Sequence, residues 1–327
     1  MVPVRLDGIG DDGYCTLDAN RRDSIIRAMI RIANAPCSWG ILEFASDTVA
    51  ASYTTVLDEI RETGYAGTEL GDWGFMPTDS RHLRHELAAR ELQLVGAFVP
   101  VALAEPKAHS AGVETAVRTA CLMRDAGATD AFVVLSDDNG SVPAREQNAG
   151  RIAAEHVLSD TAWATFASGA EAVARAVRDR TGLRTVFHPH CGGYVETPEE
   201  IDELMRRTDG SLLGMVHDSG HIMYGGGDPL RVLEQHAERV WHVHFKDCDL
   251  AVARSARDQG LGYLAAVRAQ LFCELGAGAV DFPAIVAALQ RRQYDGWAVV
   301  EQDVFPGYGT PQESARRSRA YLRNLGL

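Results

Sequence analysis

Short β-rich runs alternate with longer helical patterns from residue 30 onward, and this alternation limits the folds open to the chain. Eight runs are strand-like, and they cover residues 31–36, 66–70, 94–99, 131–135, 184–188, 212–217, 240–245 and 297–301. Helical patterns lie between them, at residues 49–63, 79–90, 113–126, 161–180, 198–207 and 229–237. Strands that alternate with helices are typical of a parallel sheet built from βα units. Eight such units predict an α/β protein with a single (β/α)8 TIM barrel over residues 30–327.

A doubly wound sheet is the other architecture that such an alternation allows. It would place the fingerprint G-x-G-x-x-G directly after an early strand, and the sequence has no such fingerprint there. The glycine run 225–227 comes too late and precedes Asp228-Pro229, which is typical of a helix start. Residues 1–29 are polar and mixed in charge, so we expect a disordered N-terminal extension before the barrel.

The charge balance and the cysteines exclude several classes of protein. With 32 Lys and Arg against 45 Asp and Glu, the net charge of −13 would repel nucleic acids and anionic lipid surfaces. The 6 cysteines include no C-x-x-C pair, which disfavours a structural zinc cluster or a disulfide scaffold. No apolar run is long enough for a transmembrane helix or a secretory signal. We therefore expect a cytoplasmic protein that binds neither nucleic acids nor membranes.

Polar residues end the last four predicted strands, although the strands of such a barrel should be apolar. These ends read HPH at 188–190, HDSGH at 217–221, HVHFKD at 242–247 and EQD at 301–303. In (β/α)8 barrels the chemistry is carried by residues at the carboxyl ends of the strands. Histidines and carboxylates from four consecutive strands should therefore meet at one rim.

Side chains alternate between the two faces of a strand, which selects one inward-facing residue at each of these ends. On the strand 240–245, the rule places Trp241, Val243 and Phe245 on the outer face, against helices. The residues that it turns inward at the four ends are His188, Asp218, His244 and Glu301. His190 is the alternative to His188, because Pro189 bends the chain between them.

Each of these residues also has a structural interpretation when it is taken alone. A single histidine at a strand end is more often a hydrogen-bonded structural residue, and a single aspartate there is usually a helix cap. Four matched ends would, however, leave buried charges facing one another without a counter-ion, which is energetically costly. Two nitrogen and two oxygen ligands suit manganese, cobalt, iron or zinc, and suit magnesium less. The sequence therefore predicts a divalent metal site.

Several sequence strings resemble the xylose-isomerase-like sugar isomerase/epimerase superfamily and, within it, the myo-inosose dehydratases. They are ANAPCSWG at 33–40, GTELG at 67–71, FHPH at 187–190, DSGH at 218–221, HFKD at 244–247, GW at 296–297 and EQD at 301–303. The segment 261–282, with FCELGAG at 272–278, also resembles an insertion that those dehydratases carry before their last helix. The resemblance spans about residues 30–325 and implies a TIM barrel with a manganese or cobalt ion, in an assembly compatible with a dimer or tetramer.

One departure from the superfamily pattern affects the expected reaction. The first ligand, a glutamate in many epimerases of the superfamily, is replaced here by His188. Epimerisation is easiest with a proton-transfer group on each face of the reacting carbon, and those epimerases use two carboxylates. Because this sequence keeps only Glu301, the pattern favours proton abstraction on one face followed by loss of a leaving group.

The resulting hypothesis is dehydration of 2-keto-myo-inositol (inosose), or of a similar keto-polyol, through an enediolate. Glu301 is the candidate base, and His221 is the first candidate to protonate the leaving hydroxide or to bind hydroxyls. His190 and Lys246 are the further candidates for that role, while His221 can instead serve only as a helix cap.

Residues near the other strand ends supply candidate substrate contacts. Glu69 can bind ring hydroxyls or be a surface residue before a turn, and Trp39 and Trp73 can stack on a sugar or close the barrel top. His242 lies one layer deeper than His244 and should support it as a donor, and Asp247 can orient Lys246 or His244.

Three alternative functions remain open at this point. A divalent-metal-dependent sugar isomerase or ketose 3-epimerase would use the same ion and enediolate but would lose no water. A lyase that cleaves 3-keto-glycosides would use a similar elimination. A barrel that only binds a sugar has no need of a complete ligand set, so the presence of all four candidate ligands argues against it.

Overall fold

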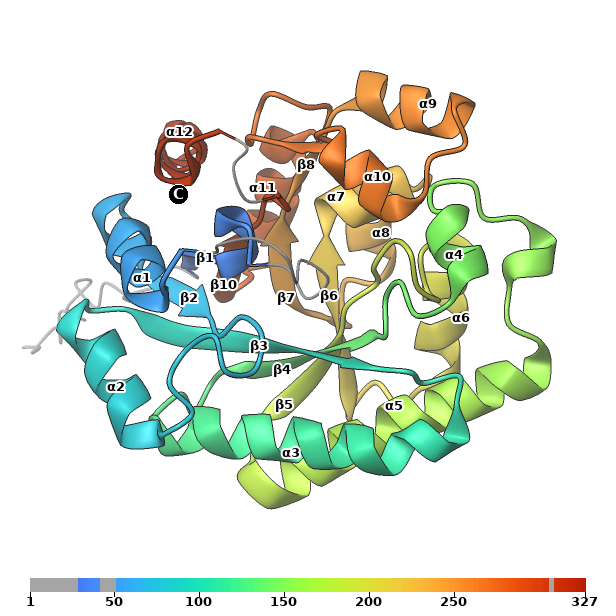
Figure 1. Ribbon diagram of the computed structural model, residues 1–327, viewed down its shortest axis with the longest axis horizontal. Coiled ribbons are helices and arrows are strands. Elements are labelled where there is room, and N and C mark those ends of the chain that lie inside the picture. Colours follow the sequence, from blue (N-terminus) through green and yellow to red (C-terminus); the bar gives the residue numbers. More distant parts are fainter. Residues whose placement is uncertain (1–28, 42–50, 306–308) are drawn as a thin grey trace, which may run out of the picture.

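Eight parallel strands close into one barrel in the computed structural model, which describes residues 29–41, 51–305 and 309–327 (Figure 1). Around the barrel their order is β1-β10-β7-β6-β5-β4-β3-β2. They are β1 (Ile30–Asn34), β2 (Gly67–Glu69), β3 (Gln93–Val101), β4 (Phe132–Asp137), β5 (Arg184–Phe187), β6 (Leu213–Asp218), β7 (Val240–Phe245) and β10 (Gly296–Val300). The predicted TIM barrel is therefore confirmed. Apart from Met29, the predicted N-terminal extension lies outside the described residues.

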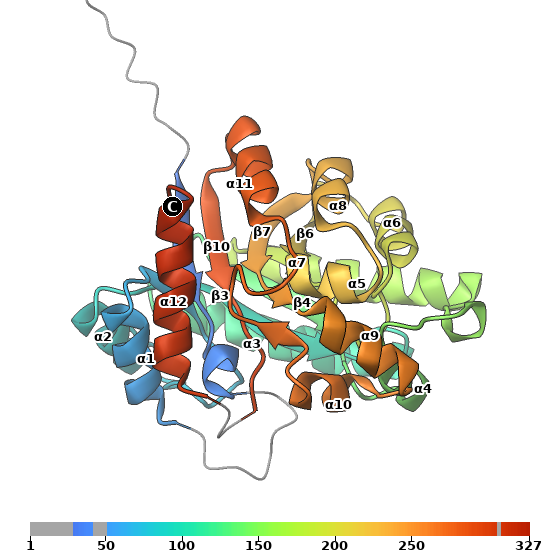
Figure 2. The same ribbon diagram turned by 90° about the horizontal axis from the view of Figure 1, so that it is seen from above.

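Helices surround the barrel on its outer side, and α12 lies beside α1 next to the point where the barrel closes (Figure 2). Ser52, Asp79, Ser159 and Thr197 cap the first turns of α1, α2, α5 and α6 with their side chains, which is why these helices begin where they do. Outside the insertion described below, the α-helices of the described residues are α1 (Tyr53–Glu62), α2 (Ser80–Ala89), α3 (His109–Asp125), α4 (Pro143–Gln147), α5 (Asp160–Thr181), α6 (Pro198–Arg207), α7 (Ser219–Tyr224), α8 (Pro229–Gln235), α11 (Phe282–Arg291) and α12 (Pro311–Asn324).

The apolar side chains form separate layers inside and outside the barrel. Small clusters inside it include Val95, Trp297 and Val299 on one side and Val134, Val186 and Val216 on the other. A much larger cluster fills the space between the strands and the helices, and it includes Val243 and Phe245 as predicted.

Trp241 is an exception to the predicted alternation. It packs on the inner cluster of Val186 and Val216 instead of on the helices. The register between β6 and β7 shifts between Met215 and Val216, which reverses the face of Trp241. Gly214 provides the space, because a Cβ there would lie 2.3 Å from the indole.

An insertion between β7 and α11 forms a small layer of its own above the barrel. It contains β8 (Asp247–Cys248), α9 (Leu250–Asp258), α10 (Tyr263–Arg268) and β9 (Phe272–Cys273), with β8 and β9 antiparallel. Its apolar residues form a separate cluster with Cys191 and Tyr224. Asp247, expected to orient Lys246 or His244, instead accepts backbone N–H groups of Cys248, Gly276, Gly278 and Val280 and so anchors this insertion.

The expectations on membrane helices and on cysteines can be compared with the described part of the chain. Within the described ranges, none of the helices combines the length and the apolar character that a bilayer crossing requires. The cysteines in those ranges, at positions 37, 121, 191, 248 and 273, are free thiols.

Candidate active site

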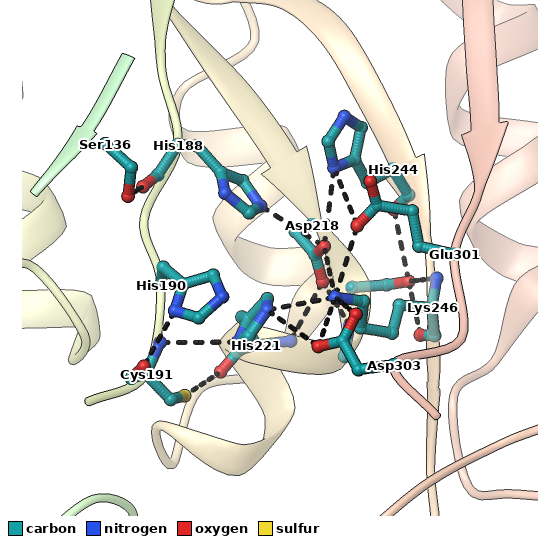
Figure 3. Close-up of polar contacts among 12 residues, drawn as sticks. Ser136, His188, His190, Cys191, Asp218, His221, His244, Lys246, Glu301 and Asp303 are labelled. Carbon is teal, nitrogen blue, oxygen red and sulfur yellow. Dashed lines mark hydrogen bonds and ion pairs between the residues drawn. The ribbon is translucent and has the colours of Figure 1, made fainter. Parts of the chain in front are cut away.

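Four side chains converge at the carboxyl ends of neighbouring strands (Figure 3). They are His188, Asp218, His244 and Glu301, and all four are buried. One candidate ligand atom from each residue lies within 4.8 Å of those from the other three. They lie at or next to the ends of β5, β6, β7 and β10, which are consecutive in the barrel order. The structure therefore brings together the residues that strand alternation selected, and we call them the four-residue cluster.

The carboxylate of Asp218 contacts a helix with one oxygen and the four-residue cluster with the other. Oδ1 accepts the backbone N–H groups of Gly220 and His221, both at 2.9 Å, and so caps α7. Oδ2 lies 3.3 Å from Nε2 of His188 and 3.6 Å from Nδ1 of His244. Asp218 is therefore both a helix cap and a member of the four-residue cluster, although the sequence presented these two roles as alternatives.

Glu69 ends β2 and contacts both inward-facing histidines of β7. Its Oε1 lies 2.9 Å from Nε2 of His242 and 3.2 Å from Nε2 of His244. When Nε2 of His244 donates to Glu69, Nδ1 faces the four-residue cluster, where it lies 3.2 Å from Oε2 of Glu301. The structure thus places Glu69 as a partner of both histidines. Glu69 also lines the cavity of this site, so its expected contact with ring hydroxyls stays a prediction.

The four-residue cluster fits a divalent transition ion. Two imidazole nitrogens and two carboxylate oxygens are suitable ligands for such an ion. Nδ1 of His244 is buried without a hydrogen-bond partner among the described residues, although it points between the carboxylates of Glu301 and Asp218. A ring nitrogen in this position is suited to ligation, because a buried polar atom otherwise needs a partner.

The protonation preferences of the four-residue cluster favour cation binding. Burial alone would raise the pKa of Asp218, but Lys246 and the surrounding histidines together outweigh it and hold this pKa well below the usual value. Burial also opposes ionisation of Glu301, yet His244 and Lys246 lower its pKa to about 2. Burial disfavours a charge on His244, while Glu301 and Glu69 raise its pKa well above the ordinary value, so an ion that binds Nδ1 would have to displace a proton from this ring. The carboxylates are therefore ionised and attract positive charge.

Lys246 follows β7, and its ammonium group lies among three carboxylates (Figure 3). Nζ is 3.0 Å from both oxygens of Asp303, 3.2 Å from Oε2 of Glu301 and 3.7 Å from Oδ2 of Asp218. Burial acts against its charge, but Asp303 and Asp218 outweigh burial and raise the pKa of Lys246 well above its usual value. Lys246 is therefore a charged hydrogen-bond donor beside the four-residue cluster.

His221 and His190 stack next to Lys246, with ring centroids 3.8 Å apart. Both ring nitrogens of His221 face donors, because the backbone N–H of Cys191 lies 3.2 Å from Nδ1 and Nζ of Lys246 lies 3.0 Å from Nε2. A neutral imidazole can accept from one of these two donors and an imidazolium from neither, so the neutral form fits better here. His190 is within 2.7 Å of the carbonyl of Cys191 through Nδ1, which leaves its Nε2 as an acceptor.

A cavity opens to solvent beside these groups, and His188, His190, His244, Lys246 and Glu301 are among its lining residues. Trp39 is not among the described residues that line it. Its indole N–H instead donates to Glu59 of α1 at 2.6 Å, because the turn after β1 directs the ring toward that helix. Trp73 lies on the surface, stacked on the guanidinium group of Arg118 at 4.2 Å.

Sequence reasoning missed two residues of this site. Asp303, which holds Lys246, lies beyond the end of β10, where strand alternation no longer predicts direction. Its only signal was its place in the EQD run. Tyr263 comes from the insertion, and its hydroxyl lies 3.0 Å from Oδ2 of Asp303. No local pattern marked this tyrosine, because the contact spans 40 positions of the chain.

Comparison with known proteins adds a family and a set of relatives. Residues 57–325 match the xylose isomerase-like TIM barrel family. An inosose dehydratase of Geobacillus kaustophilus (strain HTA426) is 30% identical to this chain over 295 residues. That alignment covers 90% of this chain and 94% of the relative.

Two solved structures share the fold. A probable 3-DHS dehydratase involved in petrobactin synthesis from Bacillus anthracis superposes with a TM-score of 0.63 at 17% identity, covering 90% of this chain and 99% of that one. An L-ribulose 3-epimerase superposes with a TM-score of 0.65 at 17% identity, covering 91% and 94%. At these identities the likeness shows a common architecture.

Proposed function

Because the chain belongs to the xylose isomerase-like TIM barrel family, we propose that it is a hydro-lyase that removes water from 2-keto-myo-inositol or a similar keto-polyol. The observation that carries the proposal is the charged Lys246 beside Glu301, which places a proton donor and an ionised carboxylate 3.2 Å apart in one cavity. The relative named inosose dehydratase, aligned along nearly its whole length, supports this choice of substrate.

The four-residue cluster of His188, Asp218, His244 and Glu301 would hold a divalent ion, with manganese or cobalt expected. When bound, such an ion supplies Lewis-acid polarisation of the substrate ketone. Nε2 of His190, which is free to accept, would bind a ring hydroxyl at the wall of the cavity. The remaining steps use the chain's own side chains.

Glu301 takes the first proton. Its ionised carboxylate lines the cavity and removes the proton from the carbon beside the ketone, which gives an enediolate. The electron pair then forms a carbon–carbon double bond as the C–O bond of the next carbon breaks. The hydroxide that leaves needs a proton at this moment.

Lys246 supplies that proton in this proposal, in preference to His221. The ammonium Nζ donates to the departing hydroxide, which leaves as water, and the enol that remains rearranges to the dione. Oε2 of Glu301, now protonated, lies 3.2 Å from Nζ and can return its proton to Lys246, so both groups are reset. His221, whose nitrogens both face donors, would position Lys246.

The test is product identification from 2-keto-myo-inositol with and without manganese. We expect a dione that absorbs in the ultraviolet, with the loss of one water per turnover. An isomeric keto-inositol with no loss of water would overturn dehydration and would favour an isomerase or epimerase. Release of a free sugar from a 3-keto-glycoside, with keto-inositol untouched, would favour the lyase for glycosides.

A further inference from the structure

The insertion that follows β7 contributes one hydroxyl group to the candidate active site. Tyr263 begins α10 and is 1% exposed, and its hydroxyl lies 3.0 Å from Oδ2 of Asp303. The ring of Tyr263 also packs near the rings of His190 and His221, with centroids 5.2 and 6.0 Å apart. The insertion is therefore in direct contact with the groups beside the four-residue cluster.

Asp303 has no regular secondary structure to fix its side chain. It lies after β10, and its carboxylate contacts Nζ of Lys246 with both oxygens. A carboxylate that accepts from a phenol on one oxygen has less freedom to rotate, because a rotation would break that hydrogen bond. Tyr263 thus restricts the orientation of Asp303, and Asp303 in turn restricts the position of Nζ.

Lys246 is also enclosed on its apolar sides, and one of these contacts comes from the insertion. Its chain passes over Gly220, where a Cβ would lie 2.6 Å from Cγ of Lys246. Nζ lies 4.9 Å from the centroid of Phe272, another residue of the insertion. The insertion therefore contacts Lys246 twice, through a ring directly and through Asp303 indirectly.

We infer that Tyr263 is a positioning residue that holds Asp303, and through it Lys246, where the ammonium can protonate the leaving hydroxide. The inference rests on the proposed function, because it assigns Tyr263 to the elimination step of that reaction. It implies that the insertion serves loss of water, because the hydrogen bond of Tyr263 leads through Asp303 to the ammonium of Lys246.

A second buried tyrosine provides a matched control. Tyr224 belongs to the same apolar cluster as Tyr263 and is fully buried, but its hydroxyl has no hydrogen-bond partner among the described residues. The substitutions Tyr263→Phe and Tyr224→Phe each remove one buried oxygen from one cluster. They differ in whether that oxygen contacts Asp303.

The experiment compares two rates in heavy water for the manganese-loaded full chain with 2-keto-myo-inositol. One rate is exchange of the hydrogen beside the ketone for deuterium, which reports proton removal, and the other is dione formation, which reports loss of water. For Tyr263→Phe we expect dione formation to fall about 10- to 100-fold while exchange changes less than about threefold. Tyr224→Phe should leave both rates unchanged, and both variants should keep the manganese affinity of the wild type.

Several results would overturn the inference. Equal losses in both rates for Tyr263→Phe would mean a general structural role, and unchanged rates would mean that the hydroxyl is dispensable. A second variant, Asp303→Asn, should reproduce the selective loss of dione formation if Tyr263 acts through Asp303, and unselective effects would contradict this. The proposed function fails separately, because in that case the wild type itself forms no dione.

Discussion

Nε2 of His244 lies 3.2 Å from Oε1 of Glu69, and this contact fixes which nitrogen of His244 faces the four-residue cluster. An imidazole that donates from Nε2 keeps its lone pair on Nδ1, which is the nitrogen that points between Glu301 and Asp218. Glu69 therefore selects the tautomer of His244 that suits a metal ligand.

Substitution of Glu69 should weaken metal binding. We expect Glu69→Gln to reduce manganese or cobalt affinity about 10- to 100-fold, because carboxylates that orient ligand histidines have effects of this size. Titration calorimetry with the metal alone measures this. An unchanged metal affinity together with a raised KM would instead show that Glu69 binds substrate hydroxyls.

The two histidines that flank Pro189 should respond differently to removal. His188 belongs to the four-residue cluster, whereas His190 stacks on His221 and hydrogen-bonds Cys191. We expect His188→Ala to abolish tight metal binding, and His190→Ala to retain it while KM for the keto-polyol rises. The metal content of the purified variants after dialysis against a limiting metal concentration distinguishes the two. Loss of metal in His190→Ala alone would reverse the assignment.

Metal should stabilise the folded chain, because the ligand atoms converge only when the barrel is closed. At a free manganese concentration 100 times the Kd, linkage predicts a gain of about 2.7 kcal/mol in the free energy of unfolding. Thermal unfolding with manganese, and after a chelator, measures the gain. His236→Ala, a change at the C-cap of α8 and outside the four-residue cluster, should leave this gain intact, while His244→Ala should remove it. An equal gain in both variants would place the ion elsewhere.

A buried ion pair holds the loop after β5 in place. Arg145 bonds both carboxylate oxygens of Glu200 at 2.8 Å and the carbonyl of Gly193 at 2.7 Å, and both charged side chains are buried. We expect Arg145→Ala to lower the free energy of unfolding by about 3–5 kcal/mol, because the carboxylate of Glu200 would stay buried without its partner. The exposed pair of Arg206 and Glu203 is the control, and Arg206→Ala should cost less than about 1 kcal/mol in urea unfolding. Similar losses for both would contradict this account.

Two buried carboxyl groups away from the four-residue cluster should make stability fall as the pH rises. Burial raises the pKa of Glu196 from 4.5 to about 7 and that of Asp137 from 3.8 to about 6. Above its unfolded pKa, 4.5 for Glu196 and 3.8 for Asp137, each group keeps a proton in the folded chain that the unfolded chain releases. Its contribution is therefore complete below that pH and is lost as the pH rises to about 7 for Glu196 and about 6 for Asp137. Each group changes the free energy of unfolding by about 1.4 kcal/mol per pH unit in its window.

The difference between wild type and Glu196→Gln isolates one of these groups. The stability of the wild type relative to this variant should decrease between pH 5 and pH 7, as measured by urea unfolding at several pH values. Glu203→Gln is the control, because Arg206 and Arg207 lower the pKa of Glu203 and move its titration below this window. A pH-independent difference for Glu196→Gln would show that its carboxyl group ionises normally.

The fold was predictable because its signals are local and repeated. All eight expected strands belong to the barrel, and the run 240–245 has the bounds of β7. Alternation also located His188, Asp218, His244 and Glu301, because each lies at or next to the end of a regular strand. Alternation predicted the wrong face for Trp241. The register shift beside Met215 arises from the pairing of two strands, so the sequence of one strand alone does not reveal it.

The rest of the site lies beyond the strands, where periodicity ends. Asp303 and Tyr263 meet through a loop and an insertion, so their contact depends on tertiary packing and not on a repeating pattern. The same holds for Asp247, whose binding of backbone N–H groups in the insertion requires that segment to be folded over it. Glu69 was located correctly at a strand end, but its partners on β7 are 173 and 175 positions away.

The shared carboxylate of Asp218 ties the start of α7 to the centre of the site. Oδ1 fixes the first turn of the helix that carries His221, and Oδ2 faces His188 and His244. A shift of α7 along its axis would therefore move this carboxylate and change its distances to His188 and His244. Because one carboxylate contacts both sides, the position of His221 and the geometry of the candidate metal ligands change together.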